Sequence, residues 1–363
     1  MPRLQLDTDC EGPLALNDNA FELCRDFLQP HGDRFFQQVS RYDDYLADVL
    51  KKPDYKAGDT LKLILPFLKA AGLTNAQVLD FSAKTIKLMP GAEAAFRFLH
   101  GRDFPLFEIS TSYRQFAEAV GARLGFDAER IFCTDLDLDR YSLSPGEAQE
   151  LRRLQAAIVA APEIQLPPGA ASLADLLGPV QQAIGRFDQI FFEQIPAMKI
   201  GVIYREVNPI GGFEKARALS VSLTTTGYSL TDVIYVGDSI TDVQAFEAVR
   251  AGGGLAVSFN GNRHAIGAAE VVVVADTAWP LALLASIFEL WGKEGVLEVA
   301  APETRQKSRA LVLSEEVIEP IATGLQSGQF SLYLSKSPNR DQVVRESAAM
   351  RAKLRGEAIA DLS

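Results

Sequence analysis

Short apolar runs alternate with amphipathic stretches along much of the chain. The runs are rich in Val, Ile, Leu and Phe, and polar or glycine-containing segments bound them, which is typical of buried strands. We predict strands at Arg3–Thr8, Leu106–Ile109, Ile131–Cys133, Val233–Val236, Leu255–Phe259 and Val271–Ala275. Helical periodicity lies between them, at Ala92–Leu99, Gln115–Leu124 and Val243–Ala251. This alternation predicts an α/β fold in which helices cover a parallel sheet.

Two long segments interrupt the alternation. Both lack convincing strands, show helical periodicity broken by prolines, and are too long to be loops within a compact domain. We therefore expect them to be insertions that form a cap over one edge of the sheet. The predicted organisation is an α/β core from residues 1–14, 88–139 and 198–295, a helical cap insertion at 15–87 and a second helical insertion at 140–197.

The remaining residues, 296–363, form a charged and polar tail. We expect one helical stretch near Leu311–Ile321 and a final helix near Arg340–Arg355. The tail is predicted to be a C-terminal helical accessory element, and no motif in it indicates chemistry.

Charge and cysteine content narrow the classes of function. The 363 residues include 36 Lys and Arg against 47 Asp and Glu, a formal net charge of −11. That excess argues against a broad nucleic-acid surface, but not against a small anionic substrate, because a bound divalent cation reverses the local field. Three cysteines without a CxxC pair indicate neither a disulfide framework nor a structural zinc site. No signal peptide or membrane-spanning run is evident, so we expect a cytoplasmic protein with no membrane insertion.

Candidate chemistry begins where the first predicted strand ends, in Leu6-Asp7-Thr8-Asp9-Cys10-Glu11-Gly12-Pro13-Leu14. Acidic residues spaced by two, followed by a glycine that allows a turn, can direct two carboxylates to one site. One carboxylate could serve as a nucleophile while the other exchanges protons. The pair is either Asp7 with Asp9 or Asp9 with Glu11.

Two further motifs supply hydroxyls and a cation. The second predicted strand runs into Ser110-Thr111-Ser112, where a hydroxyl and backbone N–H groups could hold a phosphate oxygen, or could simply cap a helix. Gly211-Gly212 opens a helix that contains Lys215. A lysine at a phosphate site offsets negative charge, although most single lysines lie on the surface.

A fourth motif, Gly237-Asp238-Ser239-Ile240-Thr241-Asp242, follows the strand at Val233–Val236. Its two carboxylates could bind a hard cation such as Mg²⁺, which prefers oxygen ligands, or could stabilise a helix N-terminus. Ligands bind at the carboxyl edge of open parallel sheets, and all four motifs are expected there.

In this order the four motifs resemble those of the haloacid dehalogenase (HAD) superfamily, and specifically its phosphatase branch. That family has a strand ending in Asp-x-Asp, a strand ending in Ser or Thr, a lysine, and a strand ending in Gly-Asp-x-x-x-Asp. Leu88-Met89-Pro90-Gly91-Ala92 resembles the family's usual lead-in to the second strand. The resemblance covers residues 3–14, 88–136 and 208–276 and implies a Rossmann-like core of the HAD type with a cap.

The resemblance also implies roles for residues. Gly12 favours Asp9 as nucleophile and Glu11 as acid/base, and phosphoserine-phosphatase-like members carry Glu at the second position. Their second motif resembles Ser110-Thr111-Ser112-Tyr113-Arg114-Gln115-Phe116-Ala117. The resemblance implies Lys215 as a charge-neutralising catalytic residue, and phosphoryl binding by Ser110, Thr111 and Ser112. It implies Mg²⁺ as cofactor, held by Asp9, Glu11 through its backbone carbonyl, Asp238 and Asp242.

The expected activity is Mg²⁺-dependent hydrolysis of a small phosphorylated metabolite through an aspartyl-phosphate. Two departures from the family pattern are Glu11, longer than Asp by one methylene, and Pro13 in place of Thr or Val. A HAD branch found in methanogens carries the same Asp-Cys-Glu-Gly-Pro motif, and its members are sometimes named as an accessory subunit of an energy-converting hydrogenase. A weakly active or inactive accessory or binding subunit is therefore the alternative. A homo-oligomer or a protein complex remains open, as does phosphoryl transfer to an acceptor other than water.

Overall fold

A seven-stranded sheet with the order β3-β2-β1-β4-β5-β6-β7 forms the centre of the computed structural model, which describes residues 3–102, 104–167, 169–301, 315–326 and 328–360. Strands β1 to β6 pair in parallel, and β7 pairs antiparallel to β6. The strands are β1 (Gln5–Thr8), β2 (Leu106–Tyr113), β3 (Ile131–Thr134), β4 (Val233–Gly237), β5 (Leu255–Phe259), β6 (Val271–Ala275) and β7 (Phe330–Leu334). The predicted α/β fold is confirmed.

The strands differ from the prediction at two places. β2 continues to Tyr113 instead of ending at Ile109, and an irregularity between Ile109 and Tyr113 shifts its pairing with β3. Ser110, Thr111 and Ser112 therefore lie within the strand and do not cap a helix. β7 was not predicted, because this edge strand is only partly buried and lacks a continuous apolar run.

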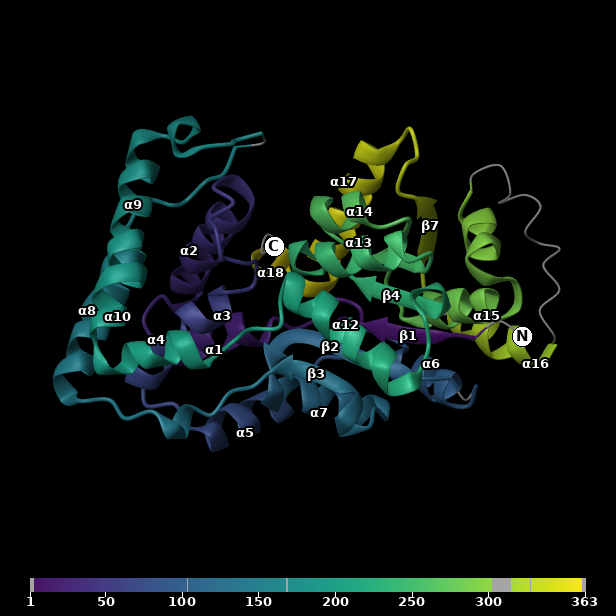
Figure 1. Ribbon diagram of the computed structural model, residues 1–363, viewed down its shortest axis with the longest axis horizontal. Helices are drawn as coiled ribbons and strands as arrows, with labels where there is room; N and C mark the ends of the chain where they lie inside the picture. Colours follow the sequence, from purple (N-terminus) through teal and green to yellow (C-terminus); the bar gives the residue numbers. More distant parts are fainter. Residues whose placement is uncertain (1–2, 103, 168, 302–314, 327, 361–363) are drawn as a thin grey trace.

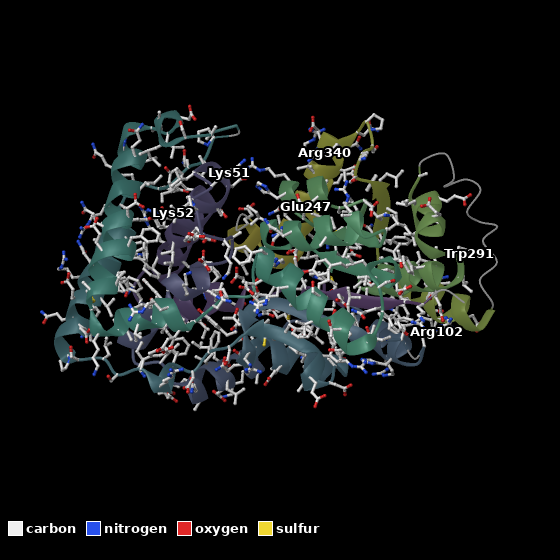
Figure 2. The ribbon with its side chains drawn as sticks, viewed as in Figure 1. Lys51, Lys52, Arg102, Glu247, Trp291 and Arg340 are labelled. Carbon is white, nitrogen blue, oxygen red and sulfur yellow. The ribbon has the colours of Figure 1, made fainter. Side chains whose placement is uncertain are left out.

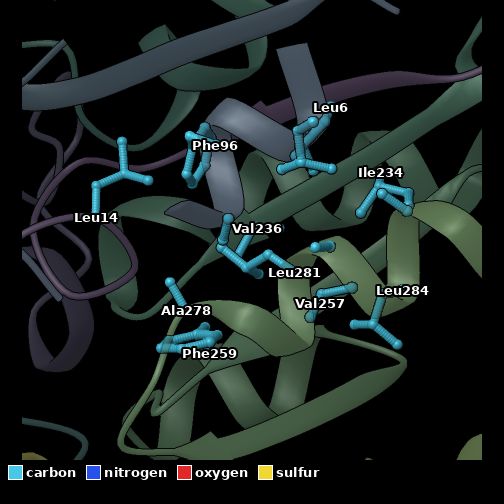
Figure 3. Close-up of a cluster of buried hydrophobic side chains, with 14 of the residues drawn as sticks. Leu6, Leu14, Phe96, Ile234, Val236, Val257, Phe259, Ala278, Leu281 and Leu284 are labelled. Atoms are coloured by element: carbon cyan, nitrogen blue, oxygen red, sulfur yellow. The ribbon is translucent and has the colours of Figure 1, made fainter. Parts of the chain in front are cut away.

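Helices cover both faces of the sheet. On one face, α6 (Ala92–His100), α7 (Arg114–Leu124) and α15 (Trp279–Ala300) pack against alternate residues of the strands. Figure 3 shows part of this core, where Phe96 and Leu281 lie near Leu6, Val236 and Val257. On the other face lie α12 (Phe213–Thr226), α13 (Val243–Ala251) and α14 (Arg263–Ala268). Burial of both faces explains why β4, β5 and β6 are almost wholly apolar.

The two helical segments pack together as one cap. Their apolar side chains share a cluster that is separate from the core under the sheet. Figure 1 shows α2 (Gly32–Asp44), α4 (Leu65–Ala70), α8 (Pro145–Ala160) and α9 (Gly178–Asp188) gathered at one end of the molecule. The remaining α-helices of these segments are α1 (Asn19–Phe27), α3 (Thr60–Leu63), α5 (Asn75–Thr85) and α10 (Ile195–Ala197). α11 (Ile203–Glu206) lies beyond the predicted boundary at residue 197, but its Ile203 joins the same apolar cluster.

In the part of the tail that the structure describes, the helices are α16 (Glu315–Gln326), α17 (Arg340–Arg355) and α18 (Glu357–Ala360). The helix predicted near Leu311–Ile321 begins outside the described residues, whereas α17 spans the predicted range. α17 covers β6, where Val343 joins a small apolar cluster with Val272 and Val274. Within the described part of the chain, no helix combines the length and apolar character needed to cross a membrane.

Candidate active site

The chain leaves β1 through a tight turn that places Asp9 and Glu11 at the carboxyl edge of the sheet. The Asp9 N–H donates to the carbonyl of Val236 in β4 at 2.8 Å, which fixes the turn beside that strand. Gly12 has a φ of +103°, and a Cβ at this position would lie 2.3 Å from Oδ2 of Asp238. Only glycine satisfies both the backbone angle and the close approach, so this residue lets the first and fourth motifs meet.

Lys215 links two of the predicted carboxylates. It lies in the first turn of α12, its side chain is 0% exposed, and its Nζ lies 2.5 Å from Oδ2 of Asp9 and 2.7 Å from Oδ1 of Asp242. The two neighbouring carboxylates raise the pKa of Lys215 despite the opposing effect of its burial. The lysine is therefore held as a cation between Asp9 and Asp242.

The two aspartates after β4 have different surroundings. Asp242 accepts hydrogen bonds on both oxygens: Oδ1 from Lys215 and from the Tyr235 hydroxyl, and Oδ2 from the N–H groups of Asp238 and Ser239. Its orientation is therefore fixed by the protein itself. The Asp238 carboxylate instead lines the pocket described below.

Asp7 lies apart from this group. It is fully buried in β1 and accepts hydrogen bonds from Gln5 at 2.8 Å and from Ser222 of α12 at 2.7 Å. Burial raises the pKa of Asp7 to about 7, although the two hydrogen bonds oppose the increase. Asp7 is not among the described residues that line the pocket, whereas Asp9 and Glu11 are.

The three hydroxyl residues of β2 do not share one environment. Thr111 lines the pocket, and its hydroxyl donates to the carbonyl of Ile210 at 3.0 Å. Ser110 is completely buried, and its Oγ accepts the N–H of Ser112 at 3.0 Å. Neither Ser110 nor Ser112 is among the described lining residues, so of the three only Thr111 lines this pocket.

Burial changes the proton affinity of both candidate acids in the first motif. Burial raises the pKa of Asp9 to about 7, while Lys215 acts in the opposite direction. Burial, with Asp18 and Asp9 nearby, raises the pKa of Glu11 well above its usual range. The Glu11 carboxyl also accepts the N–H of Asn19 at 2.8 Å, which fixes its position at the beginning of α1. Burial therefore favours the protonated form of Glu11 next to Asp9.

Two arginines from the tail complete the site, and the sequence prediction missed them. Arg351 and Arg355 of α17 contact Oδ2 of Asp238 at 2.6 and 3.2 Å, respectively. No local pattern marks them, because arginines on a polar helix usually face solvent. The i,i+4 spacing of two arginines at the end of the chain is the one signal that they share a helix face.

The pocket lies between the core, the cap and the tail. Its cavity is about 80 Å³. The core contributes Asp9, Glu11, Thr111 and Asp238, and the tail contributes Arg351, Arg355 and Ile359. The residues on the cap side include Phe36, Ser40, Asp43, Gly58, Thr60 and Leu61. The wall of the site is therefore built from all three parts of the molecule.

The donor set fits a hard divalent cation. Oxygens of Asp9, Asp238 and Asp242 lie within 4.8 Å of one another in a buried position. Carboxylates at this spacing are the ligands that Mg²⁺ prefers. Asp9 and Asp238 are the better placed direct ligands, because both line the pocket and Asp242 is not among the described residues that do.

No protein-family model matches this sequence, and a search of curated proteins found no match. Among solved structures, a gene product of Archaeoglobus fulgidus is similar over 99% of both chains, with 28% identity and a TM-score of 0.78. A HAD-family hydrolase of Salmonella enterica serovar Typhi covers 72% of this chain and 65% of its own, with 13% identity and a TM-score of 0.42. A phosphoserine phosphatase in its apo form covers 75% and 92%, with 14% identity and a TM-score of 0.39. The last two likenesses are too distant to assign an activity, whereas the first shows that the whole fold occurs in a second protein.

Proposed function

We propose that this protein is a Mg²⁺-dependent phosphomonoester hydrolase of the HAD type. Its substrate would be a small phosphorylated metabolite, and its reaction would pass through an aspartyl-phosphate in the cytoplasm. The observation that carries the proposal is the buried contact of Lys215 with Asp9 and Asp242, beside Asp238 at the carboxyl edge of the sheet. Four motifs distant in the sequence supply these groups and the adjoining Thr111, which favours a reaction centre over an accidental cluster of charge.

In this proposal, Asp9, Asp238 and the backbone carbonyl of Glu11 hold Mg²⁺. The cation would offset the repulsion between the Asp9 carboxylate and an incoming phosphate dianion. Asp242 would fix Lys215 through their 2.7 Å ion pair and not bind the cation directly. Thr111 would contact the phosphoryl oxygens from the pocket wall.

The covalent steps assign different tasks to Asp9 and Glu11. An Asp9 oxygen attacks phosphorus in line, and the bond from phosphorus to the leaving oxygen breaks. Glu11 gives its proton to that oxygen, so an alcohol leaves. Glu11 then removes a proton from water, and the resulting hydroxide attacks phosphorus. Inorganic phosphate leaves, and the Asp9 carboxylate is restored.

The environment of Glu11 supports its role as a general acid. A group that donates the first proton must be protonated at the working pH, and burial raises the pKa of Glu11 in that direction. Asp7 is poorly suited to either role, because Gln5 and Ser222 already occupy its carboxylate away from the pocket. The proposal therefore takes Asp9 with Glu11 as the reacting pair.

The experiment that tests the proposal is phosphate release from p-nitrophenyl phosphate with Mg²⁺, followed by a panel of small phosphate esters. Wild type is compared with Asp9→Asn and with the matched variant Asp7→Asn. We expect the wild type to release phosphate and EDTA to abolish this release. We expect no release by Asp9→Asn, whereas Asp7→Asn should remain active. Turnover that survives in Asp9→Asn would contradict the proposal.

One observation favours the alternative of an accessory subunit. Arg351 and Arg355 contact Asp238, the proposed metal ligand, and so compete with a cation for its carboxylate. An accessory subunit, within an oligomer or a larger complex, would bind Mg²⁺ and remain folded. It would release no phosphate from any ester of the panel.

A further inference from the structure

The C-terminal helix α17 brings two arginines into the site from the end of the chain. Arg351 is 3% exposed, and its NH1 donates to Oδ2 of Asp238 at 2.6 Å and to the backbone carbonyls of Asp238 and Asn260 at 3.2 Å. Arg355 donates to Oδ2 of Asp238 at 3.2 Å and to the carbonyls of Leu16 and Asn17 at 3.1 and 2.6 Å. The guanidinium of Arg355 thus joins the proposed metal ligand to the segment that leads from β1 into the cap.

This helix is anchored well enough to place the arginines reproducibly. The Ser347 hydroxyl donates to the carbonyl of Gly261 at 2.7 Å, and Val343 is 2% exposed against β6. Beyond Arg355, Ile359 of α18 packs against the cluster of the cap. Figure 1 shows α18 between α2 of the cap and the core helices. The tail therefore contacts the core through α17 and the cap through α18.

The ion pairs of the site balance three carboxylates with three cations. Lys215 pairs with Asp9 and Asp242, and both arginines pair with Asp238. Two further carboxyls, Glu11 and Asp18, line the same pocket. Mg²⁺ adds two positive charges and a phosphate monoester dianion adds two negative charges. The two arginines therefore make the full assembly less negative by two charges.

We propose that Arg351 and Arg355 are positioning residues of the phosphate site, where they weaken the binding of Mg²⁺ and strengthen the binding of the phosphate dianion. This inference rests on the proposed function. The arginines act on Mg²⁺ in two ways, because they share the Asp238 carboxylate with the cation and repel it. They act on phosphate by attraction, and this attraction is effective because the site is buried.

The proposal can be distinguished from a purely structural role of the arginines, because it predicts opposite changes in the affinities for Mg²⁺ and for phosphate. If the arginines only held the tail in place, their loss would disorder the site and weaken both ligands. If they act through charge, loss of one arginine tightens Mg²⁺ and weakens phosphate. The side chains of Arg351 and Arg355 are 4% and 7% exposed, and Arg355 is chosen as the target because it is the last residue of α17.

The test is isothermal titration calorimetry on the full chain with two probes, Mg²⁺ alone and inorganic phosphate at saturating Mg²⁺. In Arg355→Gln, which keeps a hydrogen-bond donor without the charge, we expect Mg²⁺ to bind about fivefold more tightly and phosphate about tenfold more weakly. Arg355→Lys should bring both affinities back toward the wild-type values. The control is Lys353→Met on the same helix, whose exposed side chain pairs with Asp276 at 2.8 Å. It should change neither affinity.

The outcomes separate this inference from the proposed function. Equal weakening of both ligands in Arg355→Gln, or no change in either, would overturn the role of the arginines while leaving the phosphatase proposal intact. A wild-type protein that binds no Mg²⁺ would contradict the proposed function itself, and the inference with it. Thermal unfolding of each variant shows whether the fold is retained. If Arg355→Gln fails to fold, Arg351→Gln is titrated with the same two probes, because Arg351 contacts the same oxygen of Asp238, and the same opposite changes are expected.

Discussion

The two carboxylates at the ends of β1 and β4 have cationic partners of different kinds. Asp9 pairs with Lys215, a wholly buried residue of the core that also pairs with Asp242, and Asp242 in turn accepts a hydrogen bond from Tyr235. Asp238 pairs with two arginines of the C-terminal helix, more than one hundred residues away along the chain. One half of the site is thus fixed by the sheet and its covering helix, whereas the other depends on the docking of the tail. The same edge of the sheet therefore combines a half that the core holds with a half that the tail holds.

The largest effect is expected at the fixed half. Lys215→Met leaves Asp9 and Asp242 buried without their shared cation, so we expect a loss of about 3 kcal/mol in the free energy of unfolding. Phosphate release should fall by at least about 1,000-fold, because the nucleophile also loses its charge partner. Urea unfolding and the phosphate assay measure the two effects. A Lys215→Met protein with wild-type stability would show that Lys215 does not fix the half of the site around Asp9.

The next effect concerns a buried acid beneath the fixed half. Glu108 of β2 is completely buried near the Cys10 thiol, and this burial raises the pKa of Glu108 from 4.5 to about 8. A raised pKa means that the folded state holds the proton more tightly than the unfolded state. The stability that this proton contributes is complete below pH 4.5 and is lost as the pH rises through about 8.

Glu108→Gln should therefore flatten the pH dependence of the free energy of unfolding between pH 5 and pH 9. We expect the variant to gain on the wild type by about 3 kcal/mol across this range, as an order of magnitude. The control is Glu247→Gln, since Glu247 lies exposed on α13 (Figure 2) and should show no such gain. If the free energies of unfolding of wild type and Glu108→Gln changed in parallel with pH, the raised pKa of Glu108 would be refuted.

A smaller effect is expected where the two halves meet. Gly12→Ala places a methyl group 2.3 Å from Oδ2 of Asp238 at a φ of +103°. We expect a loss of about 2 kcal/mol in the free energy of unfolding, together with weaker Mg²⁺ binding. The matched control is Gly146→Ala, where a Cβ meets nothing within 4 Å. If both variants unfold at the same urea concentration, the close contact between the first and fourth motifs is not essential.

The smallest effect is expected at Asp7. Asp7→Asn keeps the size of the side chain and one acceptor for Ser222, so its stability should change by only about 1 kcal/mol. Turnover should stay within about threefold of wild type, because Asp7 does not line the pocket. If Asp7→Asn lost as much turnover as Asp9→Asn, Asp7 and not Asp9 would be the better candidate for the nucleophile.

Much of the sheet could be predicted from the sequence because its central strands are buried on both faces. Leu255–Phe259 and Val271–Ala275 were predicted with the bounds that the structure has. β7 was missed because an edge strand with partly exposed side chains lacks this signal. The end of β2 was misplaced because Ser110 to Ser112 are polar yet remain in the strand.

The part of the site that could be predicted from the sequence lies where the ends of the parallel strands meet at one edge of the sheet. Asp9, Lys215, Asp238 and Asp242 were identified because each follows a buried strand or begins a helix after one, and the structure places them around one buried point. The contact of Arg351 and Arg355 with Asp238 follows from the docking of α17 across β6, which no local sequence pattern encodes. Long-range packing of a polar helix is thus the part of the site that sequence patterns do not reveal.

The identity of the nucleophile is the central claim, and trapping the intermediate tests it most directly. The protein is mixed with Mg²⁺ and a phosphate ester that it hydrolyses, and the reaction is then quenched. Reduction with borohydride converts an aspartyl-phosphate to homoserine. Peptide mass spectrometry then locates the modified residue. We predict modification at Asp9 alone and none in Asp9→Asn. Modification at Asp7, or turnover without modification of either aspartate, would contradict the account.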